Sequence, residues 1–234
     1  MLKKLFYNRK LMITVFVVLI IASSLVALGP MLYSAYMGRG VATKPVSGQG
    51  AEAASTELAG QWQVTTGNAR NFTSAGFTID EVLPSERRST SGSTKSVTGE
   101  ATVEGTELKD AQVAVDITTL TTDNDVRDNN MKTKLFEVER HPEATFSLTK
   151  PADVSTVPDS GTKATITVTG DLTIKGKTNE VTATLDALRD GDKFIVGGNI
   201  PVNRLDYDIK SPEFIAAKIA DEGTIDLRLT FEKK

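Results

Sequence analysis

The sequence predicts an all-β domain with one short helix, preceded by a single transmembrane helix. Three observations carry this prediction. Segments of alternating apolar and polar residues recur from Trp62 to the C-terminus, a long uncharged apolar run lies near the N-terminus, and only Asp123–Glu139 breaks the alternation. A period of two residues is typical of strands that bury one face, whereas an uncharged run of about 20 apolar residues is typical of a helix that crosses a bilayer.

The N-terminal part, residues 1–37, is expected to be a basic cytoplasmic end followed by a membrane anchor. Its most apolar stretch, Leu11–Leu28, is long enough to span a bilayer as a helix. Basic residues are denser before this stretch than after it: Lys3, Lys4, Arg9 and Lys10 precede it, and only Arg39 and Lys44 follow closely. The positive-inside rule then places the N-terminus in the cytoplasm and the rest of the chain outside the cell membrane. The alternative is a cleaved signal peptide, whose apolar core is typically shorter, about 7–15 residues.

Residues 38–60 are expected to form a flexible linker. This segment is rich in Gly, Ala, Ser and Thr, a composition typical of a chain without a core of its own. A coil of this length has a mean reach of about 25–30 Å. It would keep the following domain, residues 61–234, near the membrane while leaving it free to turn.

The clearest pair of strands lies between Ala164 and Leu185. In its first half every second residue is apolar or glycine, and threonine occupies most positions between them. Branched threonine suits the solvent face of a strand. Gly176, between Lys175 and Lys177, can adopt the positive φ of a tight turn. The alternation then resumes, which predicts a β-hairpin with one shared apolar side.

The other strands are predicted from the same alternation. Trp62 and Val64 begin the first of them. In the others, the alternating apolar residues lie within Phe77–Ile79, Val97–Val103, Val113–Ile117, Ala144–Leu148, Phe194–Val202 and Ile225–Phe231. The polar stretch Ser85–Ser93 is predicted to be a loop, and Asp123–Glu139 to form an amphipathic helix that ends near His141 and Pro142. Strands at such short spacing, each with one apolar face, predict a sandwich or a closed barrel.

Small residues at many inward positions favour the barrel. They are Gly99, Ala101, Ala144, Ala164, Gly170, Ala183, Ala187 and Gly198. A solid core would use larger side chains there, whereas a barrel of about eight strands can leave room for one small ligand. Such a cavity would be apolar, so its guest should be apolar too. The alternative is that Phe146, Phe194 and Phe231 fill the space from the opposite wall.

Composition excludes several classes of function. The chain has no cysteine and a single histidine, His141, which excludes disulfides, thiol catalysis and zinc–thiolate sites and disfavours a multi-histidine metal site. Residues 62–234 carry 21 basic and 28 acidic residues, a net charge of −7, so no nucleic-acid partner is expected. Asp123, Asp125 and Asp128 resemble the start of a calcium loop but lack its glycine and its closing glutamate. Because a nucleophile motif is also missing, we expect no enzyme activity, no metal and no cofactor.

Several motifs, in this order and spacing, resemble those of the YceI-like family. They are Arg127–Met131 with Leu135–Val138 and His141–Phe146, then Gly170–Thr178, Asn203–Tyr207 and Glu222–Ile225. The resemblance covers the chain from about Trp62 to the C-terminus. It implies an extended antiparallel β-barrel of lipocalin-like architecture with a small helix. It also implies that a long isoprenoid lipid, of the polyprenyl or isoprenoid-quinone type, binds inside the barrel, and many members of the family are exported.

The expected anchor, the apolar inner wall of the barrel and the family resemblance together predict a membrane-anchored extracytoplasmic protein that holds or carries an isoprenoid lipid. The alternative is a non-catalytic structural or interaction module of the cell envelope whose barrel core is solid. The expected partners are the lipid and the membrane that holds the N-terminal helix, and a homodimer is also considered.

The predicted ligand-binding residues are apolar side chains of the inner wall, with a few at the mouth of the barrel. Met131 and Leu135 would cap the mouth from the helix, and Phe214 would belong to a mobile gate. The charged residues of the matching motifs (Arg127, Asp128, Arg204 and Asp206) are interpreted as ion pairs and hydrogen bonds of the rim rather than as headgroup contacts. The full set is Phe77, Met131, Leu135, Phe136, Phe146, Leu148, Ile166, Val168, Gly170, Leu172, Phe194, Ile200, Phe214 and Phe231.

Overall fold

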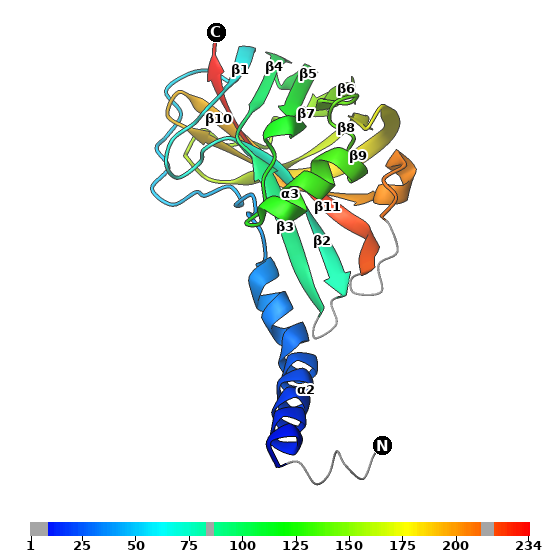
Figure 1. Ribbon diagram of the computed structural model, residues 1–234. Helices are drawn as coiled ribbons and strands as arrows, with labels where there is room; N and C mark the ends of the chain where they lie inside the picture. Colours follow the sequence, from blue (N-terminus) through cyan, green and yellow to red (C-terminus); the bar gives the residue numbers. More distant parts are fainter. Residues whose placement is uncertain (1–8, 83–86, 212–217) are drawn as a thin grey trace.

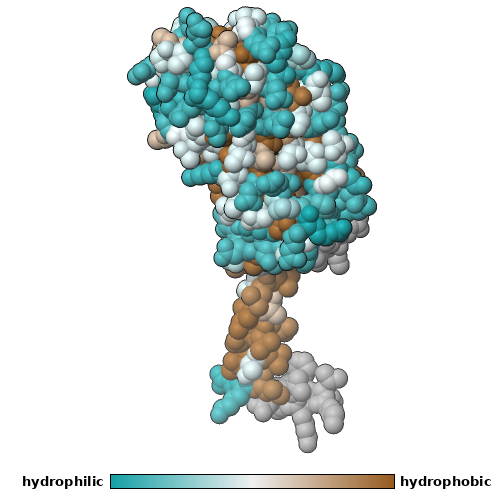
Figure 2. Space-filling view, turned by 90° about the horizontal axis from the view of Figure 1, so that it is seen from above, coloured by the Kyte–Doolittle hydropathy of each residue, from teal (hydrophilic) through white to brown (hydrophobic). Residues whose placement is uncertain are grey.

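The chain consists of a long N-terminal helix and a β-barrel, which Figure 1 shows at opposite ends of the molecule. This computed structural model describes residues 9–82, 87–211 and 218–234. Helix α2 (Arg9–Met37) contains one stretch, Arg9–Tyr33, that is long and apolar enough to cross a membrane, and none of it is buried against the domain. Figure 2 shows this apolar helix projecting from a mainly hydrophilic domain.

Eight strands in the described part of the chain close into an antiparallel barrel. The ring runs in the order β1 (Gly60–Thr65), β4 (Val97–Glu104), β5 (Glu107–Asp116), β6 (Glu143–Lys150), β8 (Ala164–Ile174), β9 (Lys177–Asp190), β10 (Lys193–Asn203) and β11 (Lys218–Lys233). Pairing of β1 with β11, in which Trp62 lies opposite Lys233, completes it. The predicted barrel is confirmed, and the sandwich is not formed.

The barrel is longer on one side, because β11 continues beyond its pairing with β1. Residues 218–228 of β11 pair with β2 (Ser74–Val82), and β2 pairs with β3 (Arg87–Thr94). A short strand, β7 (Ala152–Asp153), pairs with β5 at the other end. The prediction of a loop over Ser85–Ser93 is therefore wrong for residues 87–93. This strand is polar because its hydroxyls bond to β2: Thr90 Oγ1 donates to Glu81 at 2.9 Å, and the Ser91 and Thr78 hydroxyls lie 2.7 Å apart.

The predicted hairpin of Ala164–Leu185 is confirmed as β8 and β9. The two strands are joined through Lys175 and Gly176, which have φ values of 51° and 70°. Two consecutive residues with positive φ form the tight turn that matches the twist of a hairpin. Along β8 the side chains alternate between the interior and the solvent, as the pattern of threonines predicts.

Short helical segments lie at the mouth of the barrel, the end that carries β2 and β3. They are η1 (Ile117–Thr119), α3 (Asp125–Asn130), η2 (Met131–Leu135) and η3 (Arg204–Tyr207). The Asn124 side chain caps α3 by accepting a hydrogen bond from the Arg127 amide at 3.0 Å. The helix predicted over Asp123–Glu139 is thus formed over residues 125–135.

The segment expected to be a flexible linker lies along the outside of the barrel. Leu188 and Ile195, which face each other on β9 and β10, are covered by Val46 and Ala51. Further on, the Ala54 and Ser55 amides donate to the carbonyls of Asp159 and Gly191 at 2.7 and 2.8 Å. The expectation of a free tether is wrong, because this segment buries an apolar patch of the barrel and satisfies its own backbone there.

Arg228 of β11 holds the middle of this segment in place. Its guanidinium donates to the carbonyls of Phe72, Pro45 and Arg70 at 2.9, 3.2 and 3.1 Å and lies 4.3 Å from the centre of the Phe72 ring. The side chain is almost fully buried, and this burial lowers the pKa of Arg228.

Replacing this guanidinium should therefore destabilise the domain. Arg228→Met leaves three carbonyls without their donor, and we expect a loss of about 2 kcal/mol in the free energy of unfolding. Denaturant unfolding of the full chain in detergent measures it through the fluorescence of Trp62, the single tryptophan. The control is Arg140→Met, at an exposed side chain, which should change stability by less than about 0.5 kcal/mol. Equal stability of the two variants would contradict the role given to Arg228.

Candidate functional site

The interior of the barrel contains an apolar cavity of about 150 Å³, called here the inner cavity. Its wall consists of the inward-facing side chains of the strands, and among the described residues Thr145 is its single polar lining residue. Alternation along each strand explains this polarity, since every second side chain points inward. The small side chains Ala75, Ala101, Ala111 and Ala144 on this wall leave the space open.

Most of the residues predicted to bind a ligand line this inner cavity. Their binding role stays a prediction, but the structure brings them together on one continuous surface. They are Phe77, Phe136, Phe146, Leu148, Ile166, Val168, Leu172, Phe194, Ile200 and Phe231. Met131 and Leu135 lie nearer the mouth and line a second cavity. Phe214 lies outside the described residues.

Gly170 is the one described residue of the predicted set that lines neither cavity. A Cβ placed on it would lie 2.4 Å from Cζ of Phe146 and 2.5 Å from the carbonyl oxygen of Ser147. The glycine thus faces inward but is covered by the Phe146 ring on the neighbouring strand. Alternation predicts the direction in which a residue points, but not the rotamer of its cross-strand neighbour, so this contact could not be predicted from the sequence.

Sequence reasoning also missed part of the lining. Ile117 and Leu120, at the two ends of η1, join the wall where β5 leaves the barrel. The alternation includes Ile117, which extends the stripe of Val113 and Val115, but the predicted binding set does not name it. No sequence signal marked Leu120, because it follows a turn that breaks the alternation.

Aromatic side chains close the inner cavity at the end opposite α2. The Trp62 ring lies 5.9 Å from the Phe194 ring, and the Phe194 ring lies 6.4 Å from the Phe231 ring, measured between ring centres. Trp62 also donates its indole N–H to the Leu58 carbonyl at 2.8 Å. All three rings are buried and fill this end of the barrel, called here the closed end.

A second cavity of about 350 Å³, the outer cavity, lies at the other end of the barrel. It lies between α3, η2, η3, β2 and β11, and it shares Phe77, Phe136, Ile174 and Ile225 with the inner cavity. Tyr33 and Tyr36 of α2 also line it. The inner cavity thus has aromatic side chains at one end and the outer cavity at the other, beside the end of the long helix.

Comparison with known proteins identifies the fold. A protein-family model, the YceI-like domain, matches residues 62–231. The chain belongs to this family. Among solved structures, the YceI-like domain is similar to a polyisoprenoid binding domain from Saccharophagus degradans, with 16% identity and a TM-score of 0.55 over 74% of this chain and 98% of that one. It is also similar to Burkholderia cenocepacia BcnA, with 23% identity and a TM-score of 0.51 over 66% of this chain and 95% of that one.

A third similar structure is the YCEI protein of Campylobacter jejuni, with 22% identity and a TM-score of 0.44 over 61% of this chain and 84% of that one. No match was found among curated proteins. The first two structures, with TM-scores above 0.5, support the fold of the YceI-like domain, a closed antiparallel barrel.

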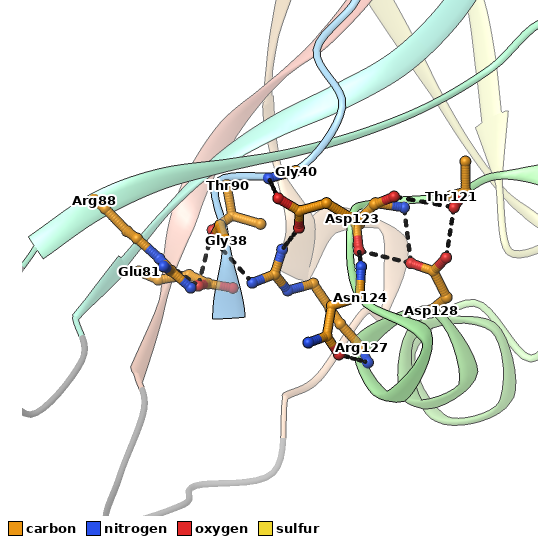
Figure 3. Close-up of polar contacts among 11 residues, drawn as sticks. Gly38, Gly40, Glu81, Arg88, Thr90, Thr121, Asp123, Asn124, Arg127 and Asp128 are labelled. Atoms are coloured by element: carbon orange, nitrogen blue, oxygen red, sulfur yellow. Dashed lines mark hydrogen bonds and ion pairs between the residues drawn. The ribbon is translucent and has the colours of Figure 1, made fainter. Parts of the chain in front are cut away.

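Charged side chains at the mouth of the YceI-like domain are engaged within the protein. Arg204 donates to the carbonyls of Ala220 and Ile209 at 2.9 and 2.7 Å and pairs with Asp221 at 2.6 Å, which ties η3 to β11. Arg127 pairs with Asp123 at 3.3 Å, as Figure 3 shows. These contacts agree with the interpretation that the charged residues of the motifs form ion pairs and hydrogen bonds within the protein rather than contacts to a lipid headgroup. The described residues contain no group of three or more His, Asp or Glu that could hold a metal ion.

Asp128 fixes the start of α3 to the loop before it. Burial opposes ionisation of this carboxylate, but hydrogen bonds from the Thr121 hydroxyl at 2.6 Å and from the Thr122 amide and hydroxyl at 2.7 Å outweigh it, so the pKa of Asp128 lies below its ordinary value. Figure 3 shows the carboxylate facing this loop. The ionised form thus holds α3 and η2 over the mouth.

Removing this charge should lower stability in a pH-dependent way. Asp128→Asn should lower the free energy of unfolding by about 1 kcal/mol at neutral pH, a modest loss because the side chain is partly exposed. A carboxylate with a lowered folded-state pKa stabilises the protein above its unfolded pKa of about 3.9 and loses this effect as the pH falls through the folded value. The difference between wild type and Asp128→Asn should therefore be constant above about pH 5 and shrink below about pH 4.

Denaturant unfolding at a series of pH values measures this difference, with Asp125→Asn, at an exposed position of the same helix, as the control. If the difference in the free energy of unfolding between wild type and Asp128→Asn stays the same down to pH 2–3, the ionised carboxylate does not hold the loop.

Proposed function

We propose that this YceI-like domain holds a long isoprenoid lipid, of the polyprenyl or isoprenoid-quinone type, inside its barrel. The observation that carries the proposal is the apolar inner cavity, bounded at one end by Trp62, Phe194 and Phe231 and adjoining the outer cavity at the other. A guest in such a cavity needs no polar partner deep inside. The Saccharophagus degradans domain of the same fold is described as polyisoprenoid binding, which supports this class of ligand.

The two cavities favour an orientation for the lipid. An engineered apolar cavity of about 150 Å³ in another protein binds benzene, so the inner cavity, of similar volume, accommodates the tip of an isoprenoid tail. The remaining units and the polar head would lie in the larger outer cavity, whose wall includes polar residues such as Thr90 and Arg127. Burial contributes about 0.8 kcal/mol for each CH₂ group, so affinity comes mainly from the tail.

We further propose that α2 is a retained anchor and that the barrel lies outside the cell membrane. The basic residues before Leu11 favour a cytoplasmic N-terminus, and the apolar stretch of α2 exceeds the core of a typical signal peptide. The intact mass of the protein recovered from membranes tests this part, since cleavage of a signal peptide would remove the helix. Light scattering on the same preparation measures its molar mass and tests whether the protein forms the homodimer considered above.

The proposed activity is binding without covalent chemistry. The competing proposal, a structural module of the envelope, predicts that nothing is bound inside the barrel. Extraction of the full chain, purified from membranes in detergent, separates the two: organic solvent should release an isoprenoid lipid that mass spectrometry identifies, and added polyprenol should be taken up. Repeated extraction without lipid, together with no uptake of polyprenol, would contradict the lipid-binding proposal.

Filling the inner cavity should reduce binding without harming the fold. Ala111 of β5 faces the cavity, whereas Ala114 of the same strand faces outward. Ala111→Leu adds about three CH₂ groups to the wall and displaces a similar part of the ligand. This should cost about 2 kcal/mol, or about 30-fold in affinity.

The measurement is a titration of the full chain with polyprenol, and Ala114→Leu is the matched control that should bind like wild type. Thermal unfolding of both variants checks that the barrel remains intact. Unchanged affinity in a folded Ala111→Leu protein would show that the ligand does not enter the inner cavity.

A further inference from the structure

The mouth of the barrel lies at the level where the proposed anchor leaves the membrane. The apolar stretch of α2 has 25 residues and ends at Tyr33, which gives a helix of about 37 Å, against a hydrocarbon core of about 30 Å. Tyrosine is favoured at the membrane–water interface. Tyr33 and Tyr36 both line the outer cavity, so the cavity begins where the bilayer ends.

The ends of three strands form an edge beside this cavity, which we call the rim: Val82, Arg87 and Lys218. Val82 lies opposite both Arg87 and Lys218 in the register of the sheet. All three are exposed. Figure 1 shows the tips of β2 and β3 and the start of β11 extending toward α2. An exposed apolar side chain between two basic ones fits the interface of a bilayer that carries anionic lipids.

Large exposed apolar side chains are also unevenly distributed over the domain. Apart from α2, those in the described part of the chain are Val41, Val82, Val126 and Leu205. Val126 lines the outer cavity. Val82 and Leu205 each follow a residue that lines it, Glu81 and Arg204. Val41 lies four residues after the end of α2. The closed end, near Trp62, presents none among the residues described. Exposed large apolar side chains of the described domain thus occur in or next to segments that line the outer cavity or follow α2.

Contacts just after α2 fix the orientation of the domain. The Gly40 amide donates to Asp123 at 3.0 Å and Arg127 donates to the Gly38 carbonyl at 3.3 Å, as Figure 3 shows. On the other side, Ser91 exchanges backbone hydrogen bonds with Arg39 and Val41, each at 3.0 Å. A Cβ on Gly40, where φ is 86°, would lie 1.8 Å from the Ser91 carbonyl oxygen, so only glycine allows this approach. The residues that follow α2 are therefore held against the barrel beside its mouth.

We propose that the rim docks on the outer surface of the bilayer that holds α2, and that lipid passes directly from that leaflet into the barrel. The inference rests on the proposed function, because it requires both the anchor and the bound lipid. It adds to the proposed function a route for the lipid: the tail moves from the leaflet past Tyr33 and Tyr36 into the outer cavity, without crossing water. The partner of the rim is thus a lipid surface that carries negative charge.

The depth of the rim can be measured directly, since the chain has no cysteine and a single one can be introduced. An environment-sensitive fluorophore is attached to Val82→Cys, and to Thr106→Cys in the exposed turn at the closed end as the control. The full chain is placed in vesicles of phosphatidylcholine and phosphatidylglycerol. The label at position 82 should emit at shorter wavelength and resist quenching by iodide, whereas the label at position 106 should behave as in water. Equal quenching at both positions would overturn the proposal.

A transfer assay separates this inference from the proposed function. Val82→Asp should slow the uptake of polyprenol from the vesicle that holds the protein by about tenfold, while uptake from detergent micelles stays at the wild-type rate. Thr106→Asp should match wild type in both assays. Wild-type uptake by Val82→Asp from vesicles, or an equal loss from micelles, would overturn docking of the rim. Failure of the wild type itself to take up polyprenol from either source would instead overturn the proposed function.

Discussion

The length of β11 is the constraint on which the rest of the structure depends. Its 16 residues pair with β10 along one edge, and with β1 and then β2 along the other. The part bound to β1 closes the ring near Trp62, and the part bound to β2 continues past the ring and builds the mouth. A shorter strand would lose one of these: the ring closure near Trp62, or the wall that extends toward α2.

A hollow barrel has fewer packing contacts in its interior than a solid one, and contacts on the outer face of this barrel add stability. Alanines on the inner wall leave dispersion contacts unmade, so the usual core supplies less than it could. The segment after α2 compensates by covering Leu188 and Ile195 and by accepting the Arg228 guanidinium. The same segment joins the barrel to α2, so stability and the position of this segment come from the same contacts.

Much of the barrel could be predicted from the sequence, because alternation is a local signal. It identified β8 and β9, their turn at Gly176, and most of the wall of the inner cavity. It failed for β3, whose Ser and Thr side chains bond across the sheet rather than to a core. It also failed for residues 38–60: the consecutive apolar residues at Phe194, Ile195 and Val196 are typical of a strand covered on both faces, but nothing local shows which segment covers the outer one. Contacts between distant segments, such as Phe146 over Gly170 or Tyr33 beside the mouth, exist only once the chain has folded.

The central claim is that an isoprenoid tail enters the barrel and ends against the aromatic side chains of the closed end. Trp62 reports on this place, because it is the single tryptophan and contacts Phe194, which lines the inner cavity. Quenching of its fluorescence by two brominated prenyl lipids, one labelled at the tail end and one beside the head, measures where each end lies. The account predicts strong quenching by the tail label and little by the head label. Equal quenching by both, or none by the tail label although the lipid is bound, would contradict it.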